Sequence, residues 1–169
     1  MDFRLAKTAD LEQVKLLYQE IVKHMQDHRM EIWDDVYPCS AFEEDIRQNR
    51  LYVLADKGVL VSAFALCDGN AGSEQVNWAS NTGKALYIDR LGVHVDALRR
   101  GIGSLMLAKA KETAKGLGAA YLRLFVVDCN VPAIRLYQKN GFARAPGVYE
   151  ERVDADLVLH EYGYEASLT

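Results

Sequence analysis

Two arginines and two glycines lie between a β-prone segment at 85–95 and a helical pattern, in the order Arg99, Arg100, Gly101, Ile102, Gly103. Glycine lets the backbone approach a ligand closely, and the first turn of a helix has N–H groups without partners inside the helix. Together with two positive side chains, these groups form an anion site that suits a pyrophosphate. The same pattern is also compatible with a tight turn that binds nothing.

Two common nucleotide sites do not fit this spacing. The chain contains no GxxxxGKS or GxxxxGKT segment, which excludes a P-loop. The dinucleotide pattern GxGxxG fails because Met106 stands where the third glycine belongs, and the strand that would open such a fold is not at the N-terminus.

A second pattern follows the β-prone run at 121–127, with the order N-x-x-A-x-x-L-Y-x-x-x-G-F at positions 130–142. With both patterns, the chain resembles the GNAT N-acetyltransferase superfamily. Residues 98–103 look like its acetyl-CoA motif, Q/R-x-x-G-x-G/A, and the second pattern looks like its other cofactor motif. Leu98 replaces the usual Gln or Arg, and Arg99 follows it. Because backbone N–H groups hold the pyrophosphate in this family, the resemblance still implies a cofactor site.

Apolar spacing and turn residues predict the elements that position these motifs. Helices are expected after Thr8, at 40–50 with Ser40 and Glu43 as a capping box, after Gly103, and at 131–140. Strands are expected at 3–6, 51–55, 59–66, 85–95 and 121–127, followed by a closing hairpin that ends at 158–164. The polar stretch 68–84 is predicted to be a long surface loop near a site.

The family resemblance implies a mixed α/β (α+β) fold, in which about seven strands include splayed central parallel strands and four helices complete the domain. It implies one N-acetyltransferase domain over residues 1–169. The pantetheine arm of acetyl-CoA would pair with the backbone of one central strand, as an added strand would. The cofactor-binding residues implied are Leu91, Val93, Arg99, Arg100, Gly101, Ile102, Gly103, Ser104, Asn130 and Ala133.

Tyr137 is the residue that the resemblance places near the thioester sulfur, as general acid for the leaving thiolate. A thiol has a pKa of about 8.5 and tyrosine one of about 10, so the phenol stays protonated at neutral pH and can donate. The alternative is a tyrosine that only packs in the core.

The amine acceptor also needs a group that takes its proton, because an alkyl amine with a pKa of about 10.4 is neutral in only about one molecule in 2,500 at pH 7. Asp89, His94 and Glu74 are candidates, and the sequence assigns the role to none of them. Acids beside aromatic residues could attract a cationic amine, although a solvated helix face is the favoured explanation; these residues are Glu31, Trp33, Asp34, Asp35, Tyr37, Glu43, Glu44 and Asp45.

Composition narrows the class of protein further. A net charge of -4 without a clustered basic face disfavours a nucleic-acid partner, and no apolar stretch is long enough for a membrane span or a signal peptide. Three cysteines without CxxC spacing indicate neither a disulfide framework nor a metal site, and they favour a cytoplasmic location. Homodimerisation is compatible with the sequence.

The function expected from these observations is acetyl transfer from acetyl-CoA to the primary amine of a small molecule or an amino-acid-like metabolite, by direct attack. A peptide or protein N-terminus is an alternative acceptor. A non-catalytic acyl-CoA sensor or regulatory module is an alternative of a different class, and an α/β domain without a cofactor is the third.

Overall fold

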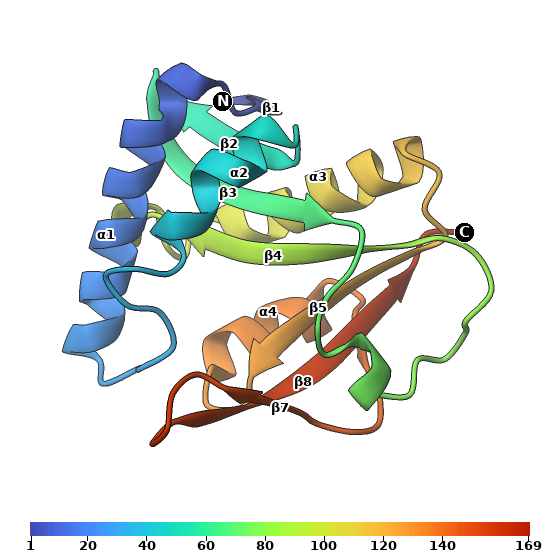
Figure 1. Ribbon diagram of the computed structural model, residues 1–169. Coiled ribbons are helices and arrows are strands. Elements are labelled where there is room, and N and C mark those ends of the chain that lie inside the picture. The colour runs from blue at the N-terminus through green and yellow to red at the C-terminus, as the bar shows by residue number, and fades with distance from the viewer. The chain divides into compact units, whose positions relative to one another are not determined.

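The protein contains eight strands and four α-helices in a computed structural model that describes residues 1–169 (Figure 1). The predicted mixed α/β fold class is confirmed, and the strand beyond the expected seven is accounted for by the two-residue β6. The elements are β1 (Asp2–Leu5), α1 (Leu11–Asp27), α2 (Phe42–Arg47), β2 (Leu51–Asp56), β3 (Val59–Cys67), β4 (Ala85–Val93), α3 (Ile102–Gly116), β5 (Tyr121–Val127), α4 (Val131–Lys139), β6 (Ala143–Arg144), β7 (Tyr149–Arg152) and β8 (Val158–Ser167).

The chain divides into two structural units. The first comprises Met1–Leu66 and Arg90–Met106, and the second comprises Cys67–Asp89 and Leu107–Thr169. Strand β4 and helix α3 each begin in one unit and end in the other. A single domain over the whole chain stays a prediction.

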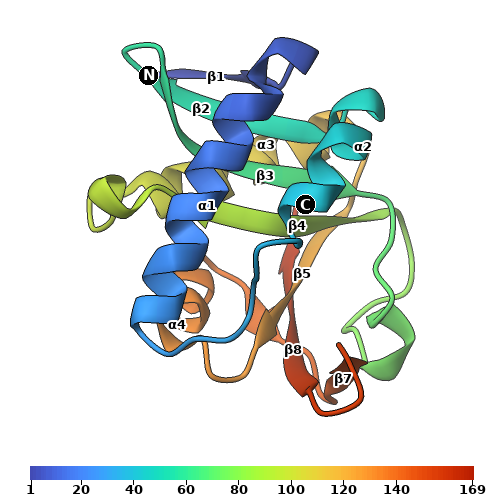
Figure 2. The same ribbon diagram turned by 60° about the vertical axis from the view of Figure 1, so that its left-hand side comes forward.

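In the first unit, β1, β2 and β3 form an antiparallel sheet. The turn between β2 and β3 has positive φ at both Lys57 (51°) and Gly58 (83°), the combination that suits the twist of a tight hairpin. The end of β4 joins this sheet, since the N–H of His94 donates to the carbonyl of Val61 at 2.8 Å. Figure 2 shows α1 and α2 in front of these strands.

Helix α1 buries the apolar stripe that its sequence predicts, and the buried side chains are Val14, Leu17, Tyr18, Ile21 and Val22. The second helix is shorter than the predicted 40–50. A 3-10 turn at Cys39–Ala41 comes first, no side chain caps α2, and left-handed Asn49 (φ 52°) follows its end. The expected Ser40 capping box is therefore wrong, because Ser40 lies inside the 3-10 turn.

In the second unit, the strand order is β4-β5-β8-β6, and β7 pairs with β8. The parallel pairing of β4 with β5 joins Ala85–Ile88 to Tyr121–Leu124, four residues in strands of nine and seven. In contrast, all seven residues of β5 pair antiparallel with β8. This limited parallel ladder agrees with the splayed central strands of the predicted fold.

Gly92 in β4 lies directly against side chains of α1. A Cβ atom at this position would lie 2.9 Å from the Tyr18 ring and 2.9 Å from Cδ1 of Ile21. We therefore predict that Gly92→Ala lowers the free energy of unfolding by about 1–3 kcal/mol, the usual effect of overpacking. Urea denaturation measures this change. Gly69→Ala is the control, since its added Cβ meets nothing within 4 Å, and equal stability of the two variants would contradict the packing argument.

Candidate active site

The turn before α3 has the backbone geometry of an anion site. Arg99 (φ 60°) and Gly101 (φ 77°) are both left-handed. The first helical hydrogen bond runs from the N–H of Leu105 to the carbonyl of Gly101 at 3.0 Å, so the N–H groups of Ile102 and Gly103 precede the helical ladder. A Cβ on Gly101 would meet nothing within 4 Å. The turn therefore needs this glycine for its conformation, and the space above it is open to a ligand.

Positive side chains surround this turn. Arg99 and Arg100 are both exposed, and Leu98 beside them is 43% exposed. The Arg100 guanidinium lies 3.8 Å from the Asp56 carboxylate, a contact that leaves 55% of the arginine side chain exposed. Because exposed pairs of this kind are weak, Arg100 remains available to an anionic ligand.

His94, a candidate for the proton acceptor, has both ring nitrogens occupied. Its Nδ1 accepts a hydrogen bond from the N–H of Asp96 at 3.1 Å, and its Nε2 lies 2.5 Å from the carboxylate of Glu20 in α1. Since Nδ1 accepts, Nε2 carries the proton and donates it to Glu20. His94 thus caps the turn at Val95–Ala97 and ties it to α1, which disfavours a role as general base.

The other cofactor motif opens α4 in the second unit. Asn130 is the N-cap, and its side-chain oxygen accepts from the N–H of Ala133 at 3.4 Å. Pro132 in the first turn suits a helix start, where a missing N–H costs nothing. The cap uses the Asn130 oxygen, so the amide nitrogen is the group through which Asn130 would bind a ligand.

Tyr137 lies on the buried side of α4 and is 8% exposed. Its ring packs against Phe142 and Tyr164, with centroids 6.1 and 6.4 Å away. Burial raises the pKa of Tyr137 to about 12. The phenol is therefore protonated throughout the physiological range, as a hydrogen-bond donor must be.

The second unit contains a cluster of three carboxyl groups, those of Asp89, Glu151 and Glu161. Of these, the sequence singled out only Asp89. Burial raises the pKa of Glu161 to about 9, and the charges of Glu151 and Asp89 act in the same direction. One carboxyl oxygen of Glu161 is buried without a hydrogen-bond partner, and Asn70 donates to Asp89 at 3.2 Å. The available signal was the presence of acids on both strands of the closing hairpin.

The long loop at 68–84 is part of the second unit. Trp78 lies under the Arg123 guanidinium at 4.5 Å and edge-on to Phe125, and Val76 forms a bridge with Gly147. The loop borders a cavity of about 370 Å³ lined by Ser73, Glu74, Val76, Asn77, Trp78, Asn81 and Arg123. Glu74 is thus placed at a polar cavity of this unit, beside a buried arginine.

The predicted cofactor residues divide between the two units. Leu91, Val93 and the turn at 99–104 lie in the first unit, whereas Asn130, Ala133 and Tyr137 lie in the second. Within the first unit, the structure brings the turn together with His94 and the end of β4. The structure contains no group of three or more His, Cys, Asp or Glu side chains that could hold a metal ion. None of its helices is both long and apolar enough to cross a membrane.

Comparisons with known proteins give consistent results. A model of the acetyltransferase (GNAT) family matches residues 15–142. The chain is 29% identical, over 174 residues, to the Bacillus subtilis (strain 168) protein named "Putative phosphinothricin acetyltransferase YwnH", with 95% of this chain and 99% of the relative covered.

Two solved structures share the fold. A GNAT-family acetyltransferase from Streptococcus agalactiae 2603 has a TM-score of 0.78 at 18% identity, covering 98% of this chain and 94% of that one. YncA from Salmonella typhimurium, solved with its cofactor acetyl-CoA, has a TM-score of 0.71 at 18% identity, covering 100% and 94%.

The raised pKa of Glu161 predicts a pH dependence of stability. Between its ordinary value of 4.5 and about 9, the folded protein holds a proton that the unfolded chain has released. The stability this proton provides is present below 4.5 and is lost as the pH rises through about 9. Glu161→Gln, which stays neutral, should therefore gain stability relative to the unmodified protein as the pH rises from 5 to 9.

Urea midpoints at pH 5, 7 and 9 measure this difference. Glu43→Gln, on an exposed residue of α2, is the control and should follow the unmodified protein at every pH. If the urea midpoints of Glu161→Gln and of the unmodified protein change equally with pH, Glu161 is not protonated in the folded protein.

Proposed function

Because the chain belongs to the acetyltransferase (GNAT) family, we propose that it transfers the acetyl group of acetyl-CoA to the primary amine of a small molecule or an amino-acid-like metabolite. Family membership confirms the resemblance seen in the two motifs. The observation that carries the proposal is the turn before α3, where Arg99 and Gly101 are left-handed, Arg99 and Arg100 are exposed, and the first N–H groups of the helix follow. This is the chemistry that a pyrophosphate requires.

The cofactor would be bound mainly by backbone groups. In this proposal the N–H groups at 101–104 hold the pyrophosphate, with Arg99 and Arg100 adding charge. The backbone of Leu91 and Val93, both half-buried at the end of β4, pairs with the pantetheine amides. Asn130 donates to the same arm through its amide nitrogen, and Ala133 follows it in the first part of α4.

The transfer step is a direct displacement at the thioester. The neutral amine nitrogen attacks the carbonyl carbon, a C–N bond forms, the C–S bond breaks and its electron pair leaves on sulfur. The amine loses a proton and the thiolate gains one, so the products are an amide and free coenzyme A. No covalent intermediate with the protein is needed, which leaves Cys39, Cys67 and Cys129 without a role in the reaction.

Tyr137 is proposed as the donor to the departing sulfur. With a pKa of about 12, full proton transfer to a thiolate whose conjugate acid has a pKa of about 8.5 is uphill by roughly 5 kcal/mol. The phenol therefore acts chiefly by donating a hydrogen bond as negative charge develops, and it stabilises the transition state more than the thioester. The thiolate then takes its proton from solvent as coenzyme A leaves.

The acceptor is proposed to be a small molecule, on the basis of the relative from Bacillus subtilis, whose name describes a phosphinothricin acetyltransferase. Among the three candidates for the proton acceptor, His94 is engaged by Glu20 and Asp96, as shown above. Asp89 lies close enough to Glu161 for its charge to raise the pKa of that carboxyl group, and Glu74 lines the polar cavity of the second unit. Asp89 and Glu74 therefore remain the candidates for the proton acceptor.

Gly101→Ala tests the pyrophosphate site. A left-handed conformation costs an alanine about 1–2 kcal/mol, so the turn should relax and the dissociation constant for acetyl-CoA should rise about fivefold or more. Isothermal titration calorimetry measures this change. Gly116→Ala is the matched control at the other end of α3, since its φ is not positive and its added Cβ meets nothing within 4 Å. Equal affinity of the two variants would contradict the assignment of the turn.

Tyr137→Phe tests the donor. We expect kcat for acetyl-CoA-dependent thiol release, with the most active amine of a screened panel, to fall about 100-fold, while the affinity for acetyl-CoA changes less than about twofold. Because the pKa of Tyr137 is about 12, the pH–rate profile should show no loss of a tyrosine donor below about pH 11. Tyr121→Phe, on a half-buried residue of β5, is the control. Unchanged turnover of Tyr137→Phe would remove the donor role.

A further inference from the structure

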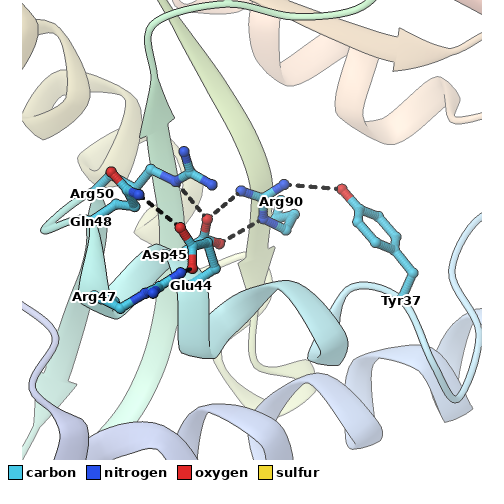
Figure 3. A network of polar contacts seen from close by, with 7 residues as sticks. All are labelled: Tyr37, Glu44, Asp45, Arg47, Gln48, Arg50 and Arg90. Carbon is cyan, nitrogen blue, oxygen red and sulfur yellow. Dashed lines mark hydrogen bonds and ion pairs between the residues drawn. The ribbon is translucent and has the colours of Figure 1, made fainter.

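A polar network in the first unit is centred on Asp45 of α2 (Figure 3). Asp45 is completely buried. The Arg90 guanidinium binds its carboxylate through two nitrogens, Nε at 2.9 Å and Nη2 at 2.8 Å, and Nε of Arg50 donates at 2.8 Å. Two-point pairing of this kind fixes direction as well as distance. The ion pair therefore fixes the side chain of Arg90, which is 9% exposed.

The backbone of Arg90 is also unusual. Its φ is 58°, a left-handed conformation inside strand β4 that side-chain-bearing residues rarely adopt. The buried hydroxyl of Tyr18, on α1, lies within hydrogen-bond distance of the carbonyl oxygens of both Arg90 and Ala63. Arg90 is thus held twice, by α2 through its side chain and by α1 through its carbonyl.

The residues after Arg90 are also held by neighbouring side chains. Gly92 lies against the Tyr18 ring, and its carbonyl accepts from the side-chain hydroxyl of Ser62 at 2.6 Å. Leu91 and Val93 are the half-buried residues on either side of Gly92, and they are the ones proposed to pair with pantetheine.

We infer that Asp45 and Arg90 are positioning residues for the cofactor. Their ion pair holds β4 in the left-handed turn that orients the backbone of Leu91 and Val93 toward the pantetheine arm, an inference that rests on the proposed function. Tyr37 extends the network, since Nη1 of Arg90 donates to its hydroxyl at 3.3 Å. The loop before α2 is thereby connected to the same strand.

Two substitutions of Arg90 distinguish positioning of the cofactor strand from stabilisation of the fold alone. Arg90→Ala and Arg90→Gly both remove the guanidinium and leave Asp45 paired with Arg50. They differ in the backbone, because glycine adopts a left-handed φ without strain and alanine does not. If the turn positions the cofactor strand, Arg90→Gly should bind acetyl-CoA about fivefold more tightly than Arg90→Ala. If the ion pair only stabilises the fold, the two affinities should be equal.

The measurement is the dissociation constant for acetyl-CoA by isothermal titration calorimetry, well below the unfolding temperature of each variant. Arg50→Gln is the matched control, since it removes a partner of the same carboxylate without touching β4, and its affinity should stay within about twofold of the unmodified protein. The inference is overturned if Arg90→Ala and Arg90→Gly bind equally, or if Arg50→Gln weakens binding as much as Arg90→Ala does.

The unmodified protein separates this inference from the proposed function. If it fails to bind acetyl-CoA, the proposed function and the inference that rests on it are both contradicted. If it binds and the two Arg90 variants bind equally, the inference alone is contradicted. A thermal unfolding curve for each variant, recorded without ligand, confirms that the titrated protein is folded.

Discussion

The arrangement of the first unit depends on one charged group that has no contact with water, the carboxylate of Asp45. A buried charge is tolerated only when it is paired and hydrogen-bonded, and removing a partner typically costs about 3–5 kcal/mol. Two arginines from different parts of the chain satisfy Asp45, one just after α2 and one in β4. This requirement joins α2 to β4 through Arg90, which is left-handed inside the strand.

The chemistry proposed for the protein comes from both units, and each contributes a different kind of group. The first offers backbone N–H groups and exposed arginines at the turn before α3, where glycine and a left-handed arginine set the conformation. The second offers donors from α4: Asn130 at the cap, and Tyr137, which burial keeps protonated. Backbone conformation thus presents the N–H donors of the first unit, and burial keeps the phenol donor of the second unit protonated. Acetyl transfer to an amine requires no metal.

Features that depend on neighbouring residues could be predicted from the sequence. Residues 121–127 form a strand with the predicted bounds, the turn after β2 follows from Asp56 to Gly58, and Asn130 begins α4 where the motif indicates. Asp45 was expected on a solvated helix face and is buried instead. This burial could not be predicted, because its partner Arg90 is 45 positions away in the sequence. The acids next to Asp45 in the sequence do not indicate that partner. For the same reason, the contact between Glu20 and His94, which lie 74 positions apart, could not be predicted from the sequence.

The turn before α3 is proposed to bind acetyl-CoA through its backbone, and hydrogen–deuterium exchange with and without acetyl-CoA tests this at the amides themselves. Exchange should slow at residues 101–104 and at 91–93 when the ligand is bound. Binding that leaves exchange at 101–104 unchanged would rule out this mode of binding, because those N–H groups would then not be the ones that hold the pyrophosphate.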